Sequence, residues 1–326
     1  MIENRLAKVS VDRIAQVAVV AHDLPKVVAY YWSIMGIGPW NIYNWEDPAV
    51  YDRTYHGKPA WSKEMICHAM VGDLELEVMQ PVEGPSLYGD FLNEHGEGVH
   101  HLQFLVDDLD EAVRVLTEEY GFPNLQGGSC GRTKKGCRYN YIYIEPLACI
   151  WELVECTEGI ATSPNIRYPE DPQSNSSKVK VKKVPGVAIV VRDLDKVARS
   201  YQEILNIGPW TVSDWNESSI SDRVYHGKPS RSREKIAVAD VGGVKLELIQ
   251  PLAGDSIYQD FLNEFGEGLH HIECHVDDVD MAAKVLTAEG FPSLESGRLG
   301  PDDSGGSYNY IEVKPLCAIW KLVHNA

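Results

Sequence analysis

The chain has 326 residues, of which 44% are hydrophobic and 24% are charged. It is more than twice as long as the roughly 150 residues of a common single domain, so we expect two packed cores. Acidic residues outnumber basic ones by 48 to 30, which gives a formal net charge of −18. A field of this sign repels nucleic-acid backbones and anionic membranes, and neither is an expected partner.

The cysteines and the N-terminus point to a reducing compartment. Seven cysteines, an odd number with no C-x-x-C pair, are typical of free cytosolic thiols and argue against a disulfide framework and a thiolate zinc site. The first ten residues lack the apolar core of a signal peptide, and no apolar stretch is long enough for a membrane helix. We therefore expect a cytoplasmic protein with a small-molecule partner, and the sequence leaves a homo-oligomer open.

The sequence contains an internal repeat. PVEGPSLYGDFLNEHGEGVHHLQFLVDDLD (81–110) returns as PLAGDSIYQDFLNEFGEGLHHIECHVDDVD (251–280), an offset of 170 that becomes 169 after one deletion. The repeat predicts two homologous domains, 13–156 and 184–325. The segment between them, 157–183, is rich in proline, serine and charge and is predicted to be a linker.

The elements expected in the first domain follow one another in two similar halves. Short β-branched runs predict strands, and stretches that begin with an aspartate and end near a glycine predict helices. In chain order these are a strand at 14–21, a helix at 23–36, strands at 66–72 and 74–81, a strand at 100–107, a helix at 108–121, and strands at 139–145 and 148–155. Each domain is thus expected to consist of two βαβββ units.

Four polar residues occupy equivalent places in these apolar strands: Gln16, Glu77, His101 and Glu152. If the two halves pack as pseudo-symmetric units, the four side chains converge. One imidazole, two carboxylates and an amide oxygen suit a divalent ion such as zinc, nickel, cobalt, manganese or iron. The alternative is that the two glutamates face water on half-exposed strands.

Several of these segments carry a family resemblance. VAVVAHDLPK (17–26), ELEVMQP (75–81) and GEGVHHLQFLVDDLD (96–110) resemble the vicinal oxygen chelate superfamily, over nearly the whole of both domains. The run from ELEVMQP to the His-His pair is similar to methylmalonyl-CoA epimerase-like members. The set Gln, Glu, His, Glu is similar to that of the zinc form of glyoxalase I.

The resemblance implies an α+β fold in which two tandem domains each form a curved mixed sheet around a cleft. It also implies that Gln16, Glu77, His101 and Glu152 bind a divalent metal, zinc in the first place. The expected activity is a metal-dependent proton transfer through an enolate, as in an epimerase, racemase, isomerase or lyase of the glyoxalase type. Glu152 is the candidate base, and Glu46 or Tyr43 is the candidate for a second base.

The second domain departs from this pattern. The equivalents of the four ligands are Gly186, Glu247, His271 and Lys321. Glycine has no side-chain ligand and an ammonium repels a cation, so we expect no catalytic metal there. Lys321 is expected either to pair with Glu247 or to lie at the surface. Because pairing halves within each domain leaves one complete ligand set, we expect the halves to pair in that way.

A cluster of aromatic residues in the first domain is the candidate substrate pocket. We expect Trp40, Tyr139, Tyr141 and His56 to contact a bulky or aromatic substrate. The alternative for the aromatic residues is the core. His56 lies in a YHGKP motif that both domains share, which favours a structural role for it.

Two other functions remain open. An extradiol-type dioxygenase uses two histidines and one carboxylate on iron, and Gln16 stands where the first histidine would be. A non-enzymatic binding protein, like the drug-sequestering members of the superfamily, is the other. Such members typically lack a complete ligand set.

Overall fold

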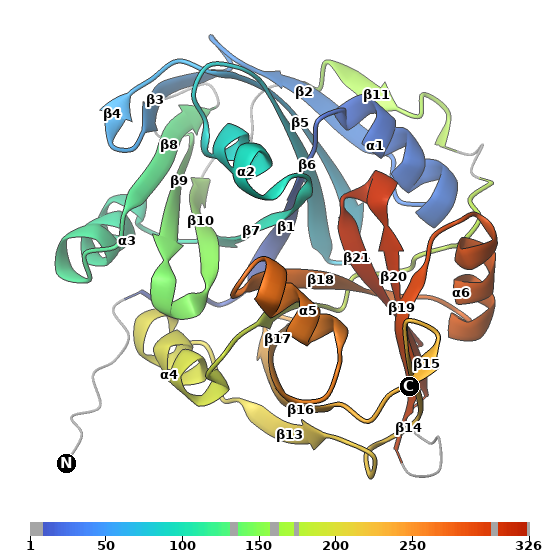
Figure 1. Ribbon diagram of the computed structural model, residues 1–326. Helices are drawn as coiled ribbons and strands as arrows, with labels where there is room; N and C mark the ends of the chain where they lie inside the picture. The colour runs from blue at the N-terminus through green and yellow to red at the C-terminus, as the bar shows by residue number, and fades with distance from the viewer. Residues whose placement is uncertain (1–8, 131–135, 157–162, 173–175, 301–305, 325–326) are drawn as a thin grey trace, which may run out of the picture.

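A computed structural model describes residues 9–130, 136–156, 163–172, 176–300 and 306–324. Figure 1 shows two curled sheets, one above the other, with helices α2 and α5 inside the curl of each. The expected α+β fold of two tandem domains is confirmed. Among the described residues, no helix is long and apolar enough to cross a membrane.

The first sheet combines both halves of the first domain. Its middle is the antiparallel pair β1 and β7, in which Ala18 lies opposite His101. One half continues outward from β1 and the other from β7, so the halves pair within the domain. The described strands, in sheet order, are β11 (Ile166–Tyr168), β2 (Trp40–Trp45), β5 (Lys63–Val71), β6 (Leu74–Glu83), β1 (Ile14–Val20), β7 (Gly98–Leu105), β10 (Cys149–Cys156), β9 (Cys137–Ile144), β8 (Asn124–Cys130), β3 (Val50–Tyr55) and β4 (Lys58–Pro59).

The second sheet repeats this order. Its central antiparallel pair is β12 and β18, with Ala188 opposite His271. Its described strands, in sheet order, are β13 (Thr211–Trp215), β16 (Arg233–Val241), β17 (Val244–Ala253), β12 (Gly186–Val190), β18 (Gly268–His275), β21 (Ala318–Val323), β20 (Ser307–Val313), β19 (Ser293–Leu299), β14 (Ile220–Tyr225) and β15 (Lys228–Pro229). The predicted βαβββ units are therefore present in both domains.

The helices begin where short polar side chains can cap them. Asp23, for example, accepts a hydrogen bond from the Lys26 amide at the start of α1, and Ser86 accepts one from Gly89 at the start of α2. The first domain contains α1 (Leu24–Tyr30), the π-helical turn η1 (Tyr31–Met35), α2 (Leu87–His95), α3 (Leu109–Arg114), the π-helical turn η2 (Val115–Glu119) and the short 3₁₀ turn η3 (Glu145–Leu147). The second contains α4 (Leu194–Leu205), α5 (Ile257–Glu264), α6 (Val279–Ala288) and η5 (Lys314–Leu316).

The two faces of each central strand serve different cores. In β1, Val17 and Val19 belong to one large hydrophobic cluster that runs through both domains. Val20, together with Leu87 and Tyr88 of α2, belongs to a separate cluster on the inner face of the first sheet. The outer faces therefore join the domains, and the inner faces enclose the space in which a site can form.

Reciprocal contacts hold the domains together. The hydroxyl of Tyr31 donates a hydrogen bond to the carbonyl of Leu316 at 2.7 Å, and the hydroxyl of Tyr201 donates one to the carbonyl of Leu147 at 3.0 Å. Each domain thus inserts a helical tyrosine into the short turn of the other.

The segment predicted as a linker packs against the domains over part of its length. Ile166–Tyr168 form β11, which pairs with β2. Further on, the amides of Val179 and Val181 donate to the carbonyls of Ile34 and Met35 at 2.8 and 3.0 Å. The described parts of 157–183 therefore add to the first sheet and to the contact between domains.

Candidate metal centre

The middle of the first sheet brings the predicted ligands to its inner face. Gln16, Glu77, His101 and Glu152 lie on β1, β6, β7 and β10, four adjacent strands. Residues that are opposite each other in a sheet share a face. All four side chains are buried. Adjacent strands therefore carry these polar groups into one apolar interior.

Three of the four predicted ligands meet directly. His101 Nε2 lies 3.5 Å from Glu77 Oε2 and 3.5 Å from Glu152 Oε2. Gln103 connects Gln16 to these three residues. Its side-chain amide donates to Gln16 Oε1 at 3.1 Å and to Glu152 Oε2 at 2.7 Å. The amide of Gln16 in turn donates to Glu75 Oε1 at 2.6 Å.

His68 is a further member of this cluster. Its Nε2 donates to Glu77 Oε1 at 2.8 Å, and its Nδ1 lies 3.9 Å from Glu75. Burial by itself would lower the pKa of His68, but the hydrogen bond to Glu77 and the nearby carboxylates outweigh burial and raise it to about 9. Burial raises the pKa of Glu77, although the contact with His68 opposes this. His68 thus fixes one oxygen of Glu77 and leaves the other facing His101.

The pair His100 and His101 departs from simple alternation. Neighbours on a strand normally point to opposite faces, but a β-bulge in β7 lies between the partners of Ala18 and Val19. The two imidazoles touch, with their Nδ1 atoms 2.8 Å apart. When His101 donates in this contact, its Nε2 carries a free lone pair, as a metal ligand requires.

The cluster fits a divalent cation. Among the described residues, no three His, Cys, Asp or Glu side chains already stand in the geometry of a bound metal ion. However, His101 Nε2 and Glu77 Oε2 are buried without any hydrogen-bond partner, facing each other. Two ligand atoms about 2.1 Å from one tetrahedral ion lie about 3.4 Å apart, close to the separations found here. Donor type, unpartnered atoms and spacing all suit a cation.

A cavity of about 170 Å³ opens onto these side chains. Its polar wall contains Gln16, Glu77 and Glu152, and neither lysine nor arginine is among the described residues that line it. The rest of the wall is mostly apolar, aromatic or sulfur-bearing: Trp45, Ile66, Met79, Tyr88, Leu105, Cys130, Cys137, Tyr139, Tyr141, Val154 and Cys156. The arrangement is an acidic, aromatic pocket that has room for one small molecule beside a metal.

The predicted substrate and base residues are distributed over several places. Tyr139 and Tyr141 line the cavity. Trp40 is fully buried in the core that the domains share, where its indole N–H donates to the Ile37 carbonyl. His56 is exposed and lies 3.9 Å from Asp90. The structure places neither Trp40 nor His56 in the cavity, because Trp40 on β2 points into the core and His56 lies in the exposed turn between β3 and β4.

The two candidates for a second base also lie outside the cavity lining. Glu46 pairs with Lys63 at 3.0 Å. The ring of Tyr43 lies 5.7 Å from that of His68, behind the histidine, and burial raises the pKa of Tyr43. The structure thus links Tyr43 to the cluster through the ring of His68 and through the charge of Glu75.

In the second domain, Lys321 occupies the equivalent space. Its Nζ lies 3.1 Å from Glu247 Oε2 and also pairs with Glu273. It stands 5.4 Å from the ring centre of Trp215 and 5.9 Å from that of Tyr310. Of the two alternatives for Lys321, the buried ion pair is the one found. The ammonium supplies the positive charge that the carboxylates of this domain need.

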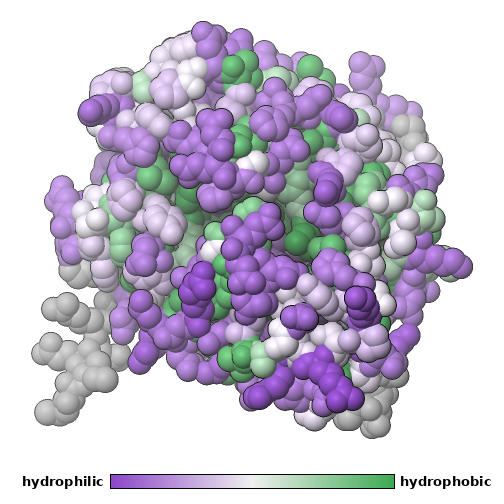
Figure 2. All heavy atoms as spheres, in the orientation of Figure 1, coloured by the Kyte–Doolittle hydropathy of each residue, from purple (hydrophilic) through white to green (hydrophobic). Residues whose placement is uncertain are grey.

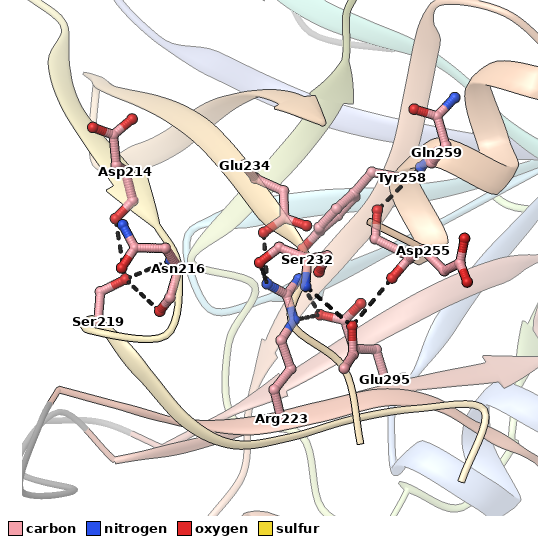
Figure 3. A network of polar contacts seen from close by, with 12 residues as sticks. Asp214, Asn216, Ser219, Arg223, Ser232, Glu234, Asp255, Tyr258, Gln259 and Glu295 are labelled. Carbon is pink, nitrogen blue, oxygen red and sulfur yellow. Dashed lines mark hydrogen bonds and ion pairs between the residues drawn. The ribbon is translucent and has the colours of Figure 1, made fainter. Parts of the chain in front are cut away.

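A second ionic network distinguishes the domains (Figure 3). In the figure, the guanidinium of Arg223 lies between two carboxylates. Its nitrogens are 2.6 Å from Glu234 and 2.7 Å from Glu295. Burial and the charge of Glu234 raise the pKa of Glu295 to about 7, against the opposing effect of Arg223. In the first domain the corresponding Arg53 contacts Glu64 at 3.0 Å, and Gln126 takes the place of Glu295.

A larger cavity, of about 760 Å³, lies between the domains. Phe91 of α2 and Phe261 of α5 are among its lining residues, and Figure 2 shows recessed hydrophobic atoms near the centre of the face that these helices flank. None of the four predicted ligands lines it. The smaller cavity is therefore the one that carries the candidate chemistry.

Sequence reasoning missed His68, Glu75 and Gln103, although a signal for His68 exists. The turn at Gly72 and Asp73 fixes the register of β5 against β6, and counting back from it places His68 opposite Glu77. Gln103 follows His101 by two positions on the same strand and therefore shares its direction.

Comparison with known proteins places the chain in a family. The sequence pattern of the Glyoxalase/Bleomycin resistance protein/Dioxygenase superfamily matches residues 15–141 and 187–310, one match in each domain. The 4-hydroxyphenylpyruvate dioxygenase of Sus scrofa is 22% identical over 282 residues, which are 82% of this chain. The chain spans 66% of the length of that dioxygenase.

Two further relatives illustrate the range of the family. The mitochondrial methylmalonyl-CoA epimerase of Mus musculus is 27% identical over 162 residues, 45% of this chain and 83% of the epimerase. A triple mutant of 4-hydroxymandelate synthase from Streptomyces coelicolor has the same fold, with a TM-score of 0.62, 15% identity, and coverage of 96% of this chain and 92% of the synthase. The resemblance predicted from the sequence is confirmed, and the chain belongs to the Glyoxalase/Bleomycin resistance protein/Dioxygenase superfamily as a tandem two-domain member.

Proposed function

We propose that the first domain is a metal-dependent enzyme that transfers a proton next to a carbonyl group of a small, aromatic substrate. Glu77, His101 and Glu152 would hold the ion, with Gln16 as the fourth donor and zinc as the first choice of metal. When bound, the ion supplies a Lewis acid that stabilises the enolate oxygen and so makes the neighbouring carbon acidic. Epimerase, racemase, isomerase and lyase reactions all share this step.

One observation carries the proposal. His101 Nε2 and Glu77 Oε2 are buried, unpartnered and 3.5 Å apart. An unsatisfied buried polar group costs about 1–3 kcal/mol, and more if it is charged. A bound cation would satisfy both atoms. The second domain has a lysine ammonium at the corresponding position. This supports the inference that the space requires a positive charge.

The side chains around the site have distinct roles in the proposed reaction. Glu152 is the base that takes and returns the proton, and the amide of Gln103 holds its Oε2 at 2.7 Å. His68 orients Glu77 through the 2.8 Å hydrogen bond. Tyr88, Tyr139 and Tyr141 form the wall that excludes water, which strengthens electrostatic interactions in the cavity.

The cavity also narrows the class of substrate. A cavity of about 150 Å³ holds a benzene molecule, so the 170 Å³ found here suits a substrate with one ring. Since the described lining has three glutamates, Glu75, Glu77 and Glu152, and none of its described residues is lysine or arginine, a polyanion such as a coenzyme A thioester is disfavoured. We propose a neutral or singly charged aryl carbonyl compound, in contrast to the thioester named for the epimerase relative.

The test is metal analysis followed by proton exchange. Purified protein supplemented with zinc, cobalt or manganese is expected to retain about one ion per chain, and His101→Ala is expected to lose it. In heavy water, the metal-loaded protein should introduce deuterium at the α-carbon of small aryl ketones. Glu152→Ala is expected to slow this exchange by about 10²–10⁴-fold, the usual contribution of a positioned base.

His271→Ala supplies the matched control, because it removes the equivalent histidine from the domain with Lys321. It should leave both the metal content and the exchange rate unchanged. A wild-type protein that takes up no divalent ion would overturn the proposal and leave a metal-free binding protein as the function.

A dioxygenase is the second candidate. It is favoured by the similarity to 4-hydroxyphenylpyruvate dioxygenase over 82% of the chain and by a second histidine, His68, which contacts the same Glu77 that His101 faces. Oxygen consumption by the iron-loaded protein, without deuterium incorporation, would support this candidate against proton transfer.

A further inference from the structure

We propose that Cys130, Cys137 and Cys156 form a reversible oxidation site at the wall of the 170 Å³ cavity of the first domain, in which a peroxide joins Cys137 to one of its neighbours by a cross-strand disulfide. This inference is independent of the metal and of the proposed reaction. It concerns a row of three thiols on three adjacent strands.

The register of the sheet places the three cysteines side by side. Cys137 on β9 is the direct partner of Cys130 on β8 and of Cys156 on β10. Directly opposed residues of antiparallel strands have Cα atoms about 4.5 or 5.5 Å apart, and both values lie within the range of about 4.4–6.8 Å that a disulfide spans. Cys130 and Cys156 are two strands apart, roughly 9.5 Å, which is too far for a bridge.

The three side chains share one face and one cavity. Directly opposed residues point to the same side of a sheet, and all three cysteines line the 170 Å³ cavity. Contact with the Cys130 thiol and burial raise the pKa of Cys137, and Cys156 also contacts it. The row lies on the face that carries Glu152, four residues along β10 from Cys156 and thus about 13 Å away.

Exposure distinguishes the row from the other thiols. Cys156 is exposed, whereas Cys130 and Cys137 are buried beside it. The four cysteines outside the row, Cys67, Cys149, Cys274 and Cys317, are all buried, so a peroxide from solvent reaches Cys156 before any of them. The second domain has Leu299 and Gly306 at the positions of Cys130 and Cys137. Oxidation would therefore be specific to the wall of the 170 Å³ cavity in the first domain.

The chemistry needs only a peroxide as oxidant. The thiolate of Cys156 attacks one oxygen of hydrogen peroxide, which breaks the O–O bond and gives a sulfenic acid and hydroxide. The sulfur of Cys137 then attacks the sulfenic sulfur, loses its proton and displaces water. Two thiols lose two electrons, and one peroxide becomes two water molecules. Exchange with Cys130 can move the bridge to the Cys130–Cys137 pair, and a dithiol reductant restores the thiols.

The experiment is peptide mapping of the whole, reduced chain after brief treatment with hydrogen peroxide. Free thiols are blocked with an alkylating agent before digestion and mass spectrometry. We expect Cys137 linked to Cys156 or Cys130, reversal by dithiothreitol, and loss of alkylation in the row about tenfold faster than at Cys149. Cys137→Ser should abolish every intramolecular disulfide, because the two outer thiols cannot reach each other.

Two further variants keep the test decisive. Cys156→Ser changes an exposed position and should still fold; it should oxidise more slowly and form only the Cys130–Cys137 bridge. Cys149→Ser, a buried thiol outside the row, should leave the mapped disulfide unchanged. The proposal is overturned if native wild type forms no cross-strand disulfide, or if folded Cys137→Ser forms as much intramolecular disulfide as wild type.

Discussion

The two domains share a chain path but satisfy their buried carboxylates in different ways. In the first, Glu77 and Glu152 face His101, and one oxygen of Glu77 has no partner. In the second, Glu247 and Glu273 close on the ammonium of Lys321. A buried carboxylate needs a counter-charge in either case. In the proposed metal site of the first domain this counter-charge would come from solution, whereas in the second domain it is the ammonium of Lys321.

The same difference extends to the surrounding walls. Trp45 and Tyr141 line the open cavity of the first domain, whereas their counterparts Trp215 and Tyr310 pack close to the Lys321 ammonium. A lysine side chain thus fills the space that a metal and a substrate would use. Exchanging counterpart residues between the domains is the most direct way to test this comparison.

The largest effect is expected from Lys321→Glu, which gives the second domain the residue of Glu152. The change leaves three carboxylates buried together without a cation, and breaking such a pair costs about 3–5 kcal/mol. Thermal or denaturant unfolding should show this loss. Lys228→Glu has the same change in charge on an exposed strand and should alter stability little. An unchanged free energy of unfolding for Lys321→Glu would contradict the role given to this ion pair.

A smaller effect is expected from His68→Val, which copies Val238 into the first domain. Without the hydrogen bond to Glu77, the ligand carboxylate loses its fixed orientation, and metal affinity should fall by about 10–100-fold. Competition with a chelator of known affinity measures this change. The reverse exchange, Val238→His, should not create a metal site, because Lys321 remains. Equal affinities of His68→Val and wild type would show that Glu77 does not depend on His68.

The smallest effect is a change in pH dependence from Glu295→Gln, which copies Gln126 into the second domain. The pKa of Glu295 is raised by burial from 4.5 to about 7, so the folded state holds a proton that the unfolded state releases in this range. Its contribution to stability is therefore full below about pH 4.5 and is lost as the pH rises through about 7. Glu295→Gln should flatten this part of the stability profile.

The reciprocal exchange checks that result. Gln126→Glu places a carboxylate near Arg53 and should introduce a pH dependence of the same sign into the first domain. If unfolding midpoints of wild type and Glu295→Gln follow pH in parallel, Glu295 does not titrate in this range.

Much of the fold could be predicted because the repeat and the strand pattern are strong local signals. The offset of 170 predicts the two domains, and the β-branched run around Val17 predicts the central strand. Helix α2 (Leu87–His95) is absent from the predicted elements, although Ser86 caps it. The pairing of β3 with β8, a contact between the two halves of the first domain, depends on tertiary packing that local patterns do not contain.

The candidate site could be predicted in part. Gln16, Glu77, His101 and Glu152 came from equivalent positions and from the family resemblance, and the structure brings three of them into contact. The bulge that turns His100 toward His101 could not be predicted, because a bulge is set by the pairing of two strands. Trp40 could not be distinguished from the aromatic residues of the cavity. The sequence shows the same residue type whether the side chain is buried in the core or against a ligand.

The reciprocal bonds from Tyr31 to Leu316 and from Tyr201 to Leu147 have a consequence for how this molecule can change. They resemble the self-matching contacts of a two-fold dimer, but both partners belong to one polypeptide. Tethering keeps the partner domain at a high effective concentration, in the millimolar range for short linkers, so dilution cannot separate the two domains. In a homodimer every substitution appears twice. Here each copy mutates alone, so one domain can carry Lys321 where the other carries Glu152 without losing the contact between them.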